Sequence, residues 1–224
     1  MLRLLIKNTV GRKMIMAVTG QILVLFIIIH MIGNSAIYSG GLNAYADRLH
    51  SLPLLVWIFR LVMLTMFSLH IVFGIGLYLE NRKAKPDEYA IRKDMRATFA
   101  SKNMVWTGLL TGVFLVYHLL HFTIQIIHPE SAALSNSDAS GLPDVSGMVV
   151  QSFQDAGVSA VYVFAVTALF LHLSHGIQSS FQSTGISSER TLPVIIKTGA
   201  ITALVLFLGY VSIPVLIYIG LVKG

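Results

Sequence analysis

The chain has 224 residues, of which 55% are hydrophobic and 12% are charged, and its mean hydropathy is +0.75. This composition is typical of an integral membrane protein and excludes a soluble domain with one large core. The absence of cysteine excludes disulfides, thiolate-bound iron–sulfur clusters and haem attachment through a Cys-x-x-Cys-His motif. The formal net charge of +6 does not indicate nucleic-acid binding, because the basic residues are distributed as membrane topology requires.

Five apolar runs follow one another along the chain, at about 14–38, 54–80, 103–128, 156–182 and 192–222. Each is long enough to cross a hydrocarbon layer, which takes about 20 residues in a helix. Because no water satisfies backbone groups in lipid, each run must be helical. The first run is too long for a signal peptide and lacks a convincing cleavage site, so it is interpreted as a retained span. We expect an all-α integral membrane protein, a single domain over 1–224 with five transmembrane helices.

The segments between the runs differ in charge. Basic residues gather before the first run and between the second and third, at Arg3, Lys7, Arg12, Lys13, Arg82, Lys83, Lys85, Arg92, Lys93, Arg96 and Lys102. The connection at 129–155 has no lysine or arginine, and the connection between the first two runs has only Arg48. The positive-inside rule therefore predicts a cytoplasmic N-terminus and a C-terminus outside.

Two of these connections have further features. Residues 81–102 could dock a cytoplasmic partner, although topology alone explains most of their charges. Residues 129–155 have a loop composition with a short surface helix expected near the end. In the last run, Pro214 is expected to kink the helix.

Four of the five runs contain a histidine well away from their ends, and ionisable side chains in hydrocarbon are costly and usually functional. Two histidines follow a Thr-Gly pair after nine residues, and two precede a glycine in a His-x3-Gly-Ile pattern. The first pattern comprises Thr19, Gly20 and His30, repeated as Thr107, Gly108 and His118, and the second comprises His70 and Gly74, repeated as His172 and Gly176.

The predicted orientation converts these positions into depth. His30 and His118 lie ten and eleven residues from the outer turn, or about 15–17 Å at the helical rise. His70 and His172 both lie seventeen residues from the outer side, or about 26 Å. The sequence therefore predicts an outer pair, His30 with His118, and an inner pair, His70 with His172, about 10 Å apart in depth. Two such pairs suggest two bis-histidine haem sites.

His121 and His175 compete for the ligand role, since each lies one turn from a favoured histidine. Only His118 and His172 match the repeats, so they are preferred. His121 and His175 could instead hydrogen-bond a haem propionate or a quinone, or simply bond within the bundle. The glycines at positions 20, 74, 108 and 176 could let a porphyrin edge approach the backbone, although small residues also serve ordinary helix packing in membranes.

Longer stretches around these histidines resemble a known family, the cytochrome b membrane-anchor subunit of succinate dehydrogenases and fumarate reductases, of the single-chain, five-span, two-haem type. The stretches are Thr19-Gly-Gln through His30-Met-Ile-Gly-Asn34; Leu69-His70-Ile-Val-Phe-Gly74 with Glu80-Asn81-Arg82; Phe114-Leu-Val-Tyr-His118-Leu-Leu-His-Phe122; and Leu171-His-Leu-Ser-His-Gly176 with Ser180-Phe-Gln182. The resemblance covers nearly the whole chain.

The resemblance implies an anchor, in a bacterial cytoplasmic membrane, for a flavoprotein and an iron–sulfur protein on the cytoplasmic side. Electrons would pass between the iron–sulfur subunit and membrane quinone through two b-type haems held by His30, His70, His118 and His172. Of the quinones, menaquinone is preferred to ubiquinone. The dicarboxylate chemistry would belong to the partner, and complexes could dimerise. No Asp or Glu lies deep within a run, and Asp47 is the only acidic residue of the first outer connection, so transmembrane proton coupling is not predicted.

Three other functions are compatible with parts of the pattern. A two-haem cytochrome b of a hydrogenase or formate dehydrogenase shares bis-histidine helices. A metal or proton transporter could use the His-x2-His pairs of the third and fourth runs, but the missing carboxylates exclude a di-iron bundle. A purely structural anchor needs no redox centre.

Overall fold

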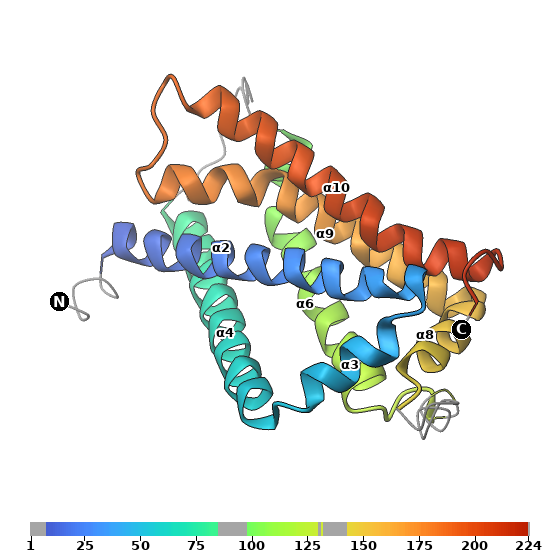
Figure 1. The fold of residues 1–224 in the computed structure, drawn as a ribbon. Coiled ribbons are helices and arrows are strands. Elements are labelled where there is room, and N and C mark those ends of the chain that lie inside the picture. Colours follow the sequence, from blue (N-terminus) through green and yellow to red (C-terminus); the bar gives the residue numbers. More distant parts are fainter. Residues whose placement is uncertain (1–7, 85–97, 130, 132–142, 224) are drawn as a thin grey trace.

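Five long helices dominate the computed structural model, which describes residues 8–84, 98–129, 131 and 143–223 (Figure 1). They are α2 (Thr9–Asn34), α4 (Pro53–Lys83), α6 (Met104–His118), α9 (Ala156–Ser183) and α10 (Leu192–Tyr218). Together with the short turns η1 (Ser35–Ser39) after α2 and η2 (Leu119–Thr123) after α6, they give five segments long and apolar enough to cross a membrane. The chain is therefore an all-α, multi-pass membrane protein, as predicted.

Local signals in the sequence set where these helices begin. The side chain of Asn8 accepts a hydrogen bond from the backbone of Val10 at the start of α2, and Asp155 accepts one from Val158 at the start of α9. Pro53 opens α4, a position where its missing N–H costs nothing. α2 begins five residues earlier than expected, and its first turns carry Arg12, which forms an ion pair with Glu80 near the end of α4.

The third span ends earlier than expected, at Thr123 instead of 128. The α-helix widens into the π-helical turn η2 directly after His118. Beyond it, Gln125 and His128 adopt positive φ angles of 61° and 56°, which a continuing helix does not allow. Pro214 is buried inside α10, and the helix continues past it to Tyr218.

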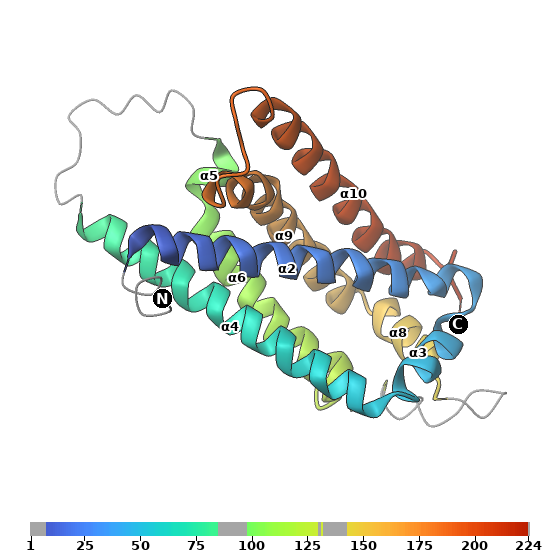
Figure 2. The same cartoon turned by 60° about the vertical axis from the view of Figure 1, so that its left-hand side comes forward.

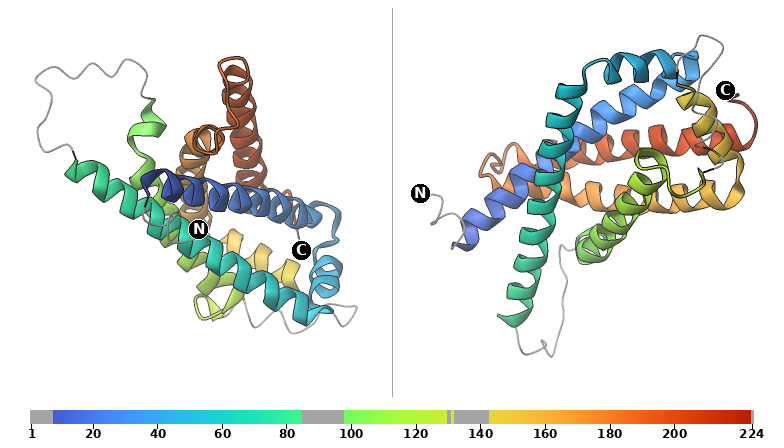
Figure 3. Two further views of the ribbon diagram at one scale, coloured as in Figure 1. Left: turned by 90° about the vertical axis from the view of Figure 1, so that its left-hand side faces the viewer. Right: turned by 90° about the horizontal axis from the view of Figure 1, so that it is seen from below.

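Four of the helices form a bundle, and the fifth lies against its side (Figures 2 and 3). α2 packs against α4 and α9, and α6 packs against α9 and α4. The pairs α2 with α6 and α4 with α9 therefore face each other across the diagonals of the bundle. α10 packs along α9 and touches α2.

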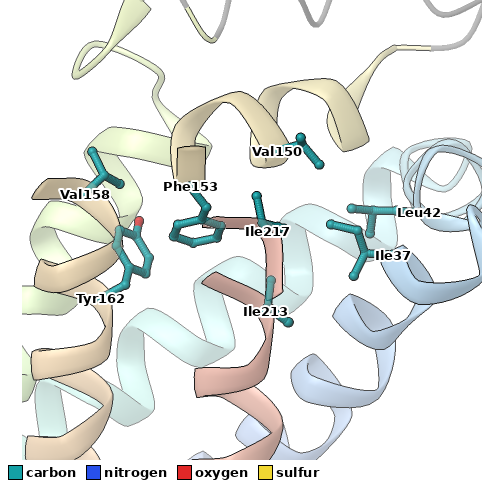
Figure 4. Packing of buried hydrophobic residues seen from close by; sticks show 8 residues of the cluster. All are labelled: Ile37, Leu42, Val150, Phe153, Val158, Tyr162, Ile213 and Ile217. Carbon is teal, nitrogen blue, oxygen red and sulfur yellow. The ribbon is translucent and has the colours of Figure 1, made fainter. Parts of the chain in front are cut away.

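Two short helices, α3 (Leu42–His50) and α8 (Val145–Gln154), pack together at the end of the bundle where α2 ends and α9 begins, called here the α3/α8 end. The helix expected late in the 129–155 connection is thus confirmed as α8, whereas α3 was not predicted. Figure 4 shows the buried apolar cluster beneath them, formed by Ile37, Leu42, Val150, Phe153, Val158, Tyr162, Ile213 and Ile217. Asn43 joins the two helices, donating to Asp144 at 3.1 Å and accepting from the backbone of Ser146 at 2.8 Å.

The basic clusters behind the predicted orientation lie partly outside the described residues. These are Arg3, Lys7, Lys85, Arg92, Lys93 and Arg96. Most of the predicted partner-docking segment 81–102 also lies outside them; its end forms the short helix α5 (Phe99–Lys102). Orientation in the membrane remains a prediction.

Candidate paired-histidine sites

The four histidines singled out by the repeats lie in two close pairs, each across a diagonal of the bundle. The rings of His30 on α2 and His118 on α6 have centroids 6.0 Å apart and planes at 84°. The rings of His70 on α4 and His172 on α9 have centroids 6.2 Å apart and planes at 80°. The structure thus brings together the same partners that depth arithmetic paired.

The two pairs occupy different levels of the bundle. His30 lies four residues before the end of α2, and His118 is the last residue of α6, so this pair is near the α3/α8 end. His70 instead contacts α2 at Thr19, eleven residues before His30. At the helical rise the levels are separated by about 16 Å along α2. This separation exceeds the 10 Å expected, because His30 lies only four residues from the end of α2 and not ten residues below the outer turn. After Asn34 the chain crosses the α3/α8 end in η1 and α3 before α4 begins.

His70 and His172 make equivalent hydrogen bonds through Nδ1. His70 Nδ1 lies 3.1 Å from the Met16 carbonyl oxygen, and His172 Nδ1 lies 3.2 Å from the Met104 carbonyl oxygen. Because a carbonyl oxygen only accepts, Nδ1 must carry the proton in both rings. The lone pair of each neutral imidazole is then on Nε2, the arrangement in which a second hydrogen bond orients a metal-ligating histidine.

The glycines of the repeats lie beside these same side chains. A Cβ atom on Gly20 would lie 3.1 Å from His70 Cε1, and one on Gly108 would lie 3.0 Å from His172 Cε1. At Gly74 and Gly176 the nearest side chains are Met16 and Met104, both at 3.8 Å. Gly20 and Gly108 therefore give clearance to an imidazole, and the clearance for a porphyrin edge expected from the sequence stays a prediction.

Aromatic side chains surround the His30–His118 pair. His30 stacks on Phe26, with centroids 5.3 Å apart, and lies 6.2 Å from the ring of Tyr210. His118 Nδ1 lies 3.4 Å from the hydroxyl of Tyr162, which is 6% exposed. The sequence did not reveal Tyr162 as a site residue; the available signal was a tyrosine within a span, whose hydroxyl needs a partner when buried.

The neighbouring histidines have other partners. His121, in the π-helical turn, stacks on Phe122 with centroids 4.1 Å apart, and its Nδ1 lies 3.0 Å from the Tyr162 hydroxyl. His175 Nδ1 lies 3.2 Å from the side-chain nitrogen of Gln178 on the same helix. The His175 ring is thus held by a side chain of its own helix, whereas Nδ1 of His172 meets a main-chain oxygen of another helix.

The ring separations fit two imidazoles that bind one metal from opposite sides. A metal–imidazole bond is about 2 Å long and the ring centroid lies about 1 Å behind the nitrogen, so opposed ligands have centroids about 6 Å apart. Among the described residues no group of three or more His, Cys, Asp or Glu side chains is arranged to hold an ion. Two protein ligands per site suit a metal whose other ligands come from a macrocycle, as in haem.

A polar pocket lies close to the His30–His118 pair. It has a volume of about 190 Å³ and is lined by His128, Ser131, Gln151, Ser152, Asp155 and Val158. The ring of His128 lies 5.3 Å from that of His121. The pocket is smaller than those that enclose drug-sized ligands, typically about 300–1,000 Å³, so it has room for a single polar ring and not for a long tail.

Comparison with protein-family models, with curated proteins and with solved structures gives no match to this chain.

Proposed function

We propose that the chain is the cytochrome b membrane anchor of a succinate dehydrogenase or fumarate reductase complex and carries electrons between an iron–sulfur partner and membrane quinone. The observation that carries this proposal is the two diagonal imidazole pairs with centroid separations of 6.0 and 6.2 Å. His30 and His118 would hold one haem b, and His70 and His172 the other. When bound, each haem supplies an iron that takes up and releases one electron.

The protein's own contribution is to hold and orient the ligands. The main-chain oxygens of Met16 and Met104 keep the Nδ1 protons of His70 and His172 in place and leave Nε2 as the ligand atom. With two imidazoles for each haem, His30 with His118 and His70 with His172 would hold a group that transfers electrons and does not bind oxygen. Apolar surroundings and hydrogen bonds to the ligands set the potential of such a site.

The order of the electron path follows from the predicted orientation. The His70–His172 pair lies away from the α3/α8 end and would face the cytoplasm, where a flavoprotein and an iron–sulfur subunit would dock. The His30–His118 pair would face the outside. The polar pocket beside it would take the head group of the quinone, with menaquinone preferred.

The spectrum of the purified chain tests the proposal. We expect two haems per chain in the reduced absorption spectrum, and one haem or none would contradict the two-haem function. His70→Ala and His172→Ala should each remove one haem. The matched variants His121→Ala and His175→Ala, one turn away on the same segments, should leave both bound. Copurification of a flavin-containing subunit would distinguish this complex from a hydrogenase or formate dehydrogenase.

A further inference from the structure

The side chain of Thr19 lies beside His70 in a fixed orientation. Its hydroxyl lies 2.8 Å from the main-chain oxygen of Ile15 and 3.0 Å from that of Met16, and donates to this pair of carbonyls on α2. The hydroxyl oxygen lies 3.5 Å from Nδ1 of His70. The Met16 carbonyl, at 3.1 Å, is the nearer acceptor of the Nδ1 proton, and the Thr19 oxygen is a second, longer one.

The same arrangement recurs in the second half of the chain. The Thr107 hydroxyl donates to the main-chain oxygens of Asn103 at 3.0 Å and Met104 at 3.2 Å, and its own oxygen lies 3.4 Å from Nδ1 of His172. Gly108 follows Thr107 as Gly20 follows Thr19, and each glycine lies beside Cε1 of the imidazole. The two arrangements involve different helices and agree in residue type, hydrogen bonds and spacing. One helix turn alone therefore does not explain them.

Within the part of the chain that the structure describes, the His30–His118 pair has no equivalent threonine and glycine arrangement. Its rings pack against Phe26, Tyr210, Phe114 and Phe122, and the His118 ring meets a tyrosine hydroxyl through Nδ1. The two pairs thus differ in how their rings are fixed. A substitution of Thr19 or Thr107 should therefore affect only the His70–His172 pair.

We propose that Thr19 and Thr107 are positioning residues: the Met16 and Met104 carbonyls set the Nδ1–H tautomer, and the threonine oxygens, as second partners of Nδ1–H, fix the rotation of the His70 and His172 rings. Each threonine, with the carbonyl three residues before it and the glycine after it, forms a seat that holds Nδ1–H and directs Nε2 toward the facing imidazole. The use of these seats for haem rests on the function proposed above, whereas the tautomer does not depend on bound haem.

The test is nitrogen-15 NMR of the full-length, haem-free chain in lipid bilayers, labelled at histidine. Protonated and unprotonated ring nitrogens resonate far apart, and His70→Gln and His172→Gln assign the two signals. We expect both histidines in the Nδ1–H form. Thr19→Val, which keeps the shape and removes the oxygen, should shift and broaden the Nδ1 signal of His70, because the ring keeps only its carbonyl partner, and should leave His172 unchanged. Thr107→Val should do the reverse.

Matched controls separate this effect from loss of fold. Thr65→Val on α4 and Thr167→Val on α9 remove hydroxyls with the same bond four residues back, but these side chains are exposed, so neither Nδ1 signal should change. Thr19→Ser and Thr107→Ser should restore the parent signals. An Nε2–H form in the parent chain, or an unchanged His70 signal in Thr19→Val, would overturn the proposal.

The haem-loaded chain gives the second readout. Weakening the bond to Nδ1 makes imidazole a poorer electron donor, so Thr19→Val and Thr107→Val should raise the midpoint potential of one haem and leave that of the other unmoved. An equal shift of both potentials would contradict the seats. If the chain bound no haem, the proposed function would fail while the NMR result would still decide on the seats.

Discussion

At the scale of single residues, the hydrogen bond to Nδ1 is what distinguishes one histidine from another. His172 and His175 lie one turn apart on α9, yet Nδ1 of the first donates to a main-chain carbonyl of α6 and Nδ1 of the second lies beside the Gln178 side chain of its own helix. The carbonyl leaves the lone pair of His172 on Nε2. Hydropathy and depth treat the two as nearly equal; the repeat prefers His172, and its hydrogen bond to another helix distinguishes it further.

Tyr162 makes a comparable choice between His118 and His121. Its hydroxyl has one proton and lies within reach of Nδ1 of both rings. If His118 binds metal through Nε2, its Nδ1–H donates to Tyr162, whose own proton then goes to His121. In this arrangement the Tyr162 hydroxyl accepts from only one of the two histidines. We assign that role to His118, because its ring faces His30.

Replacing Tyr162 with phenylalanine should therefore destabilise the protein and disturb one site only. The change leaves polar ring atoms of two histidines without this hydroxyl, at a cost of about 1–3 kcal/mol. We expect a lower thermal unfolding midpoint and a changed spectrum for the haem at His30–His118, with the other haem unaltered. Tyr78→Phe is the control, because Tyr78 is exposed on α4. Equal behaviour of the two variants would show that the Tyr162 hydroxyl has no such role.

At the scale of elements, close contacts attach the short surface helices to the long ones. Gly33, in the last turn of α2, is buried, and a Cβ there would lie 2.6 Å from Cζ and 2.8 Å from Cε1 of Tyr45 on α3. Glycine at this position lets the end of the Tyr45 side chain, which is 41% exposed, lie directly on the backbone of α2.

A pair of glycine substitutions tests this contact. Gly33→Ala forces the end of the Tyr45 side chain away and should destabilise the protein by up to about 1 kcal/mol, less than overpacking of a closed core, because that side chain is 41% exposed and can turn aside. Gly76→Ala on α4 has open space around its Cβ position and should be neutral or stabilising by up to about 1 kcal/mol, since alanine favours helix over glycine. Thermal unfolding in detergent measures both. A neutral Gly33→Ala would mean that α3 is not held to α2 here.

Asn43 attaches α3 to α8 by two hydrogen bonds, one to the side chain of Asp144 and one from the backbone of Ser146. Because Asp144 also caps α8 by accepting from Gly147 at 2.8 Å, Asn43→Ala should loosen the first turn of this helix. We expect faster hydrogen exchange of the Ser146 and Gly147 amides and a loss of about 1–2 kcal/mol, as for a lost cap. Unchanged exchange in α8, with exchange in α10 as the reference, would contradict the link.

At the scale of the whole molecule, each histidine pair joins the two halves of the chain. α2 and α4 form one half and α6 and α9 the other, and every pair takes one ring from each half. Neither site exists until both halves have packed together. The repeated spacing of Thr, Gly and His in the sequence therefore corresponds to a two-helix unit that is repeated in the structure.

This architecture explains what the sequence could and could not predict. Hydropathy predicts all five spans because lipid permits nothing but a helix, and equal depth pairs the histidines because straight helices convert residue number into height. Depth cannot show that Gly20 lies beside an imidazole or that Tyr162 lies between two histidines, since those contacts depend on helix rotation. The π-helical turn after His118 and the helix α3 depend on packing at the α3/α8 end, and no local signal specifies them.

The predicted orientation has a direct test because the chain contains no cysteine, so one introduced thiol is the only one in it. Ser51, between α3 and α4, and Ser188, between α9 and α10, are both exposed and lie at opposite ends of the bundle by the alternation of the helices. The positive-inside rule places Ser51 outside and Ser188 in the cytoplasm. A membrane-impermeant maleimide should therefore label Ser51→Cys in intact cells and label Ser188→Cys only after the cells are opened. The reverse labelling would show the opposite orientation in the membrane. The His30–His118 pair and its polar pocket would then lie on the cytoplasmic side, where the iron–sulfur partner is proposed to dock.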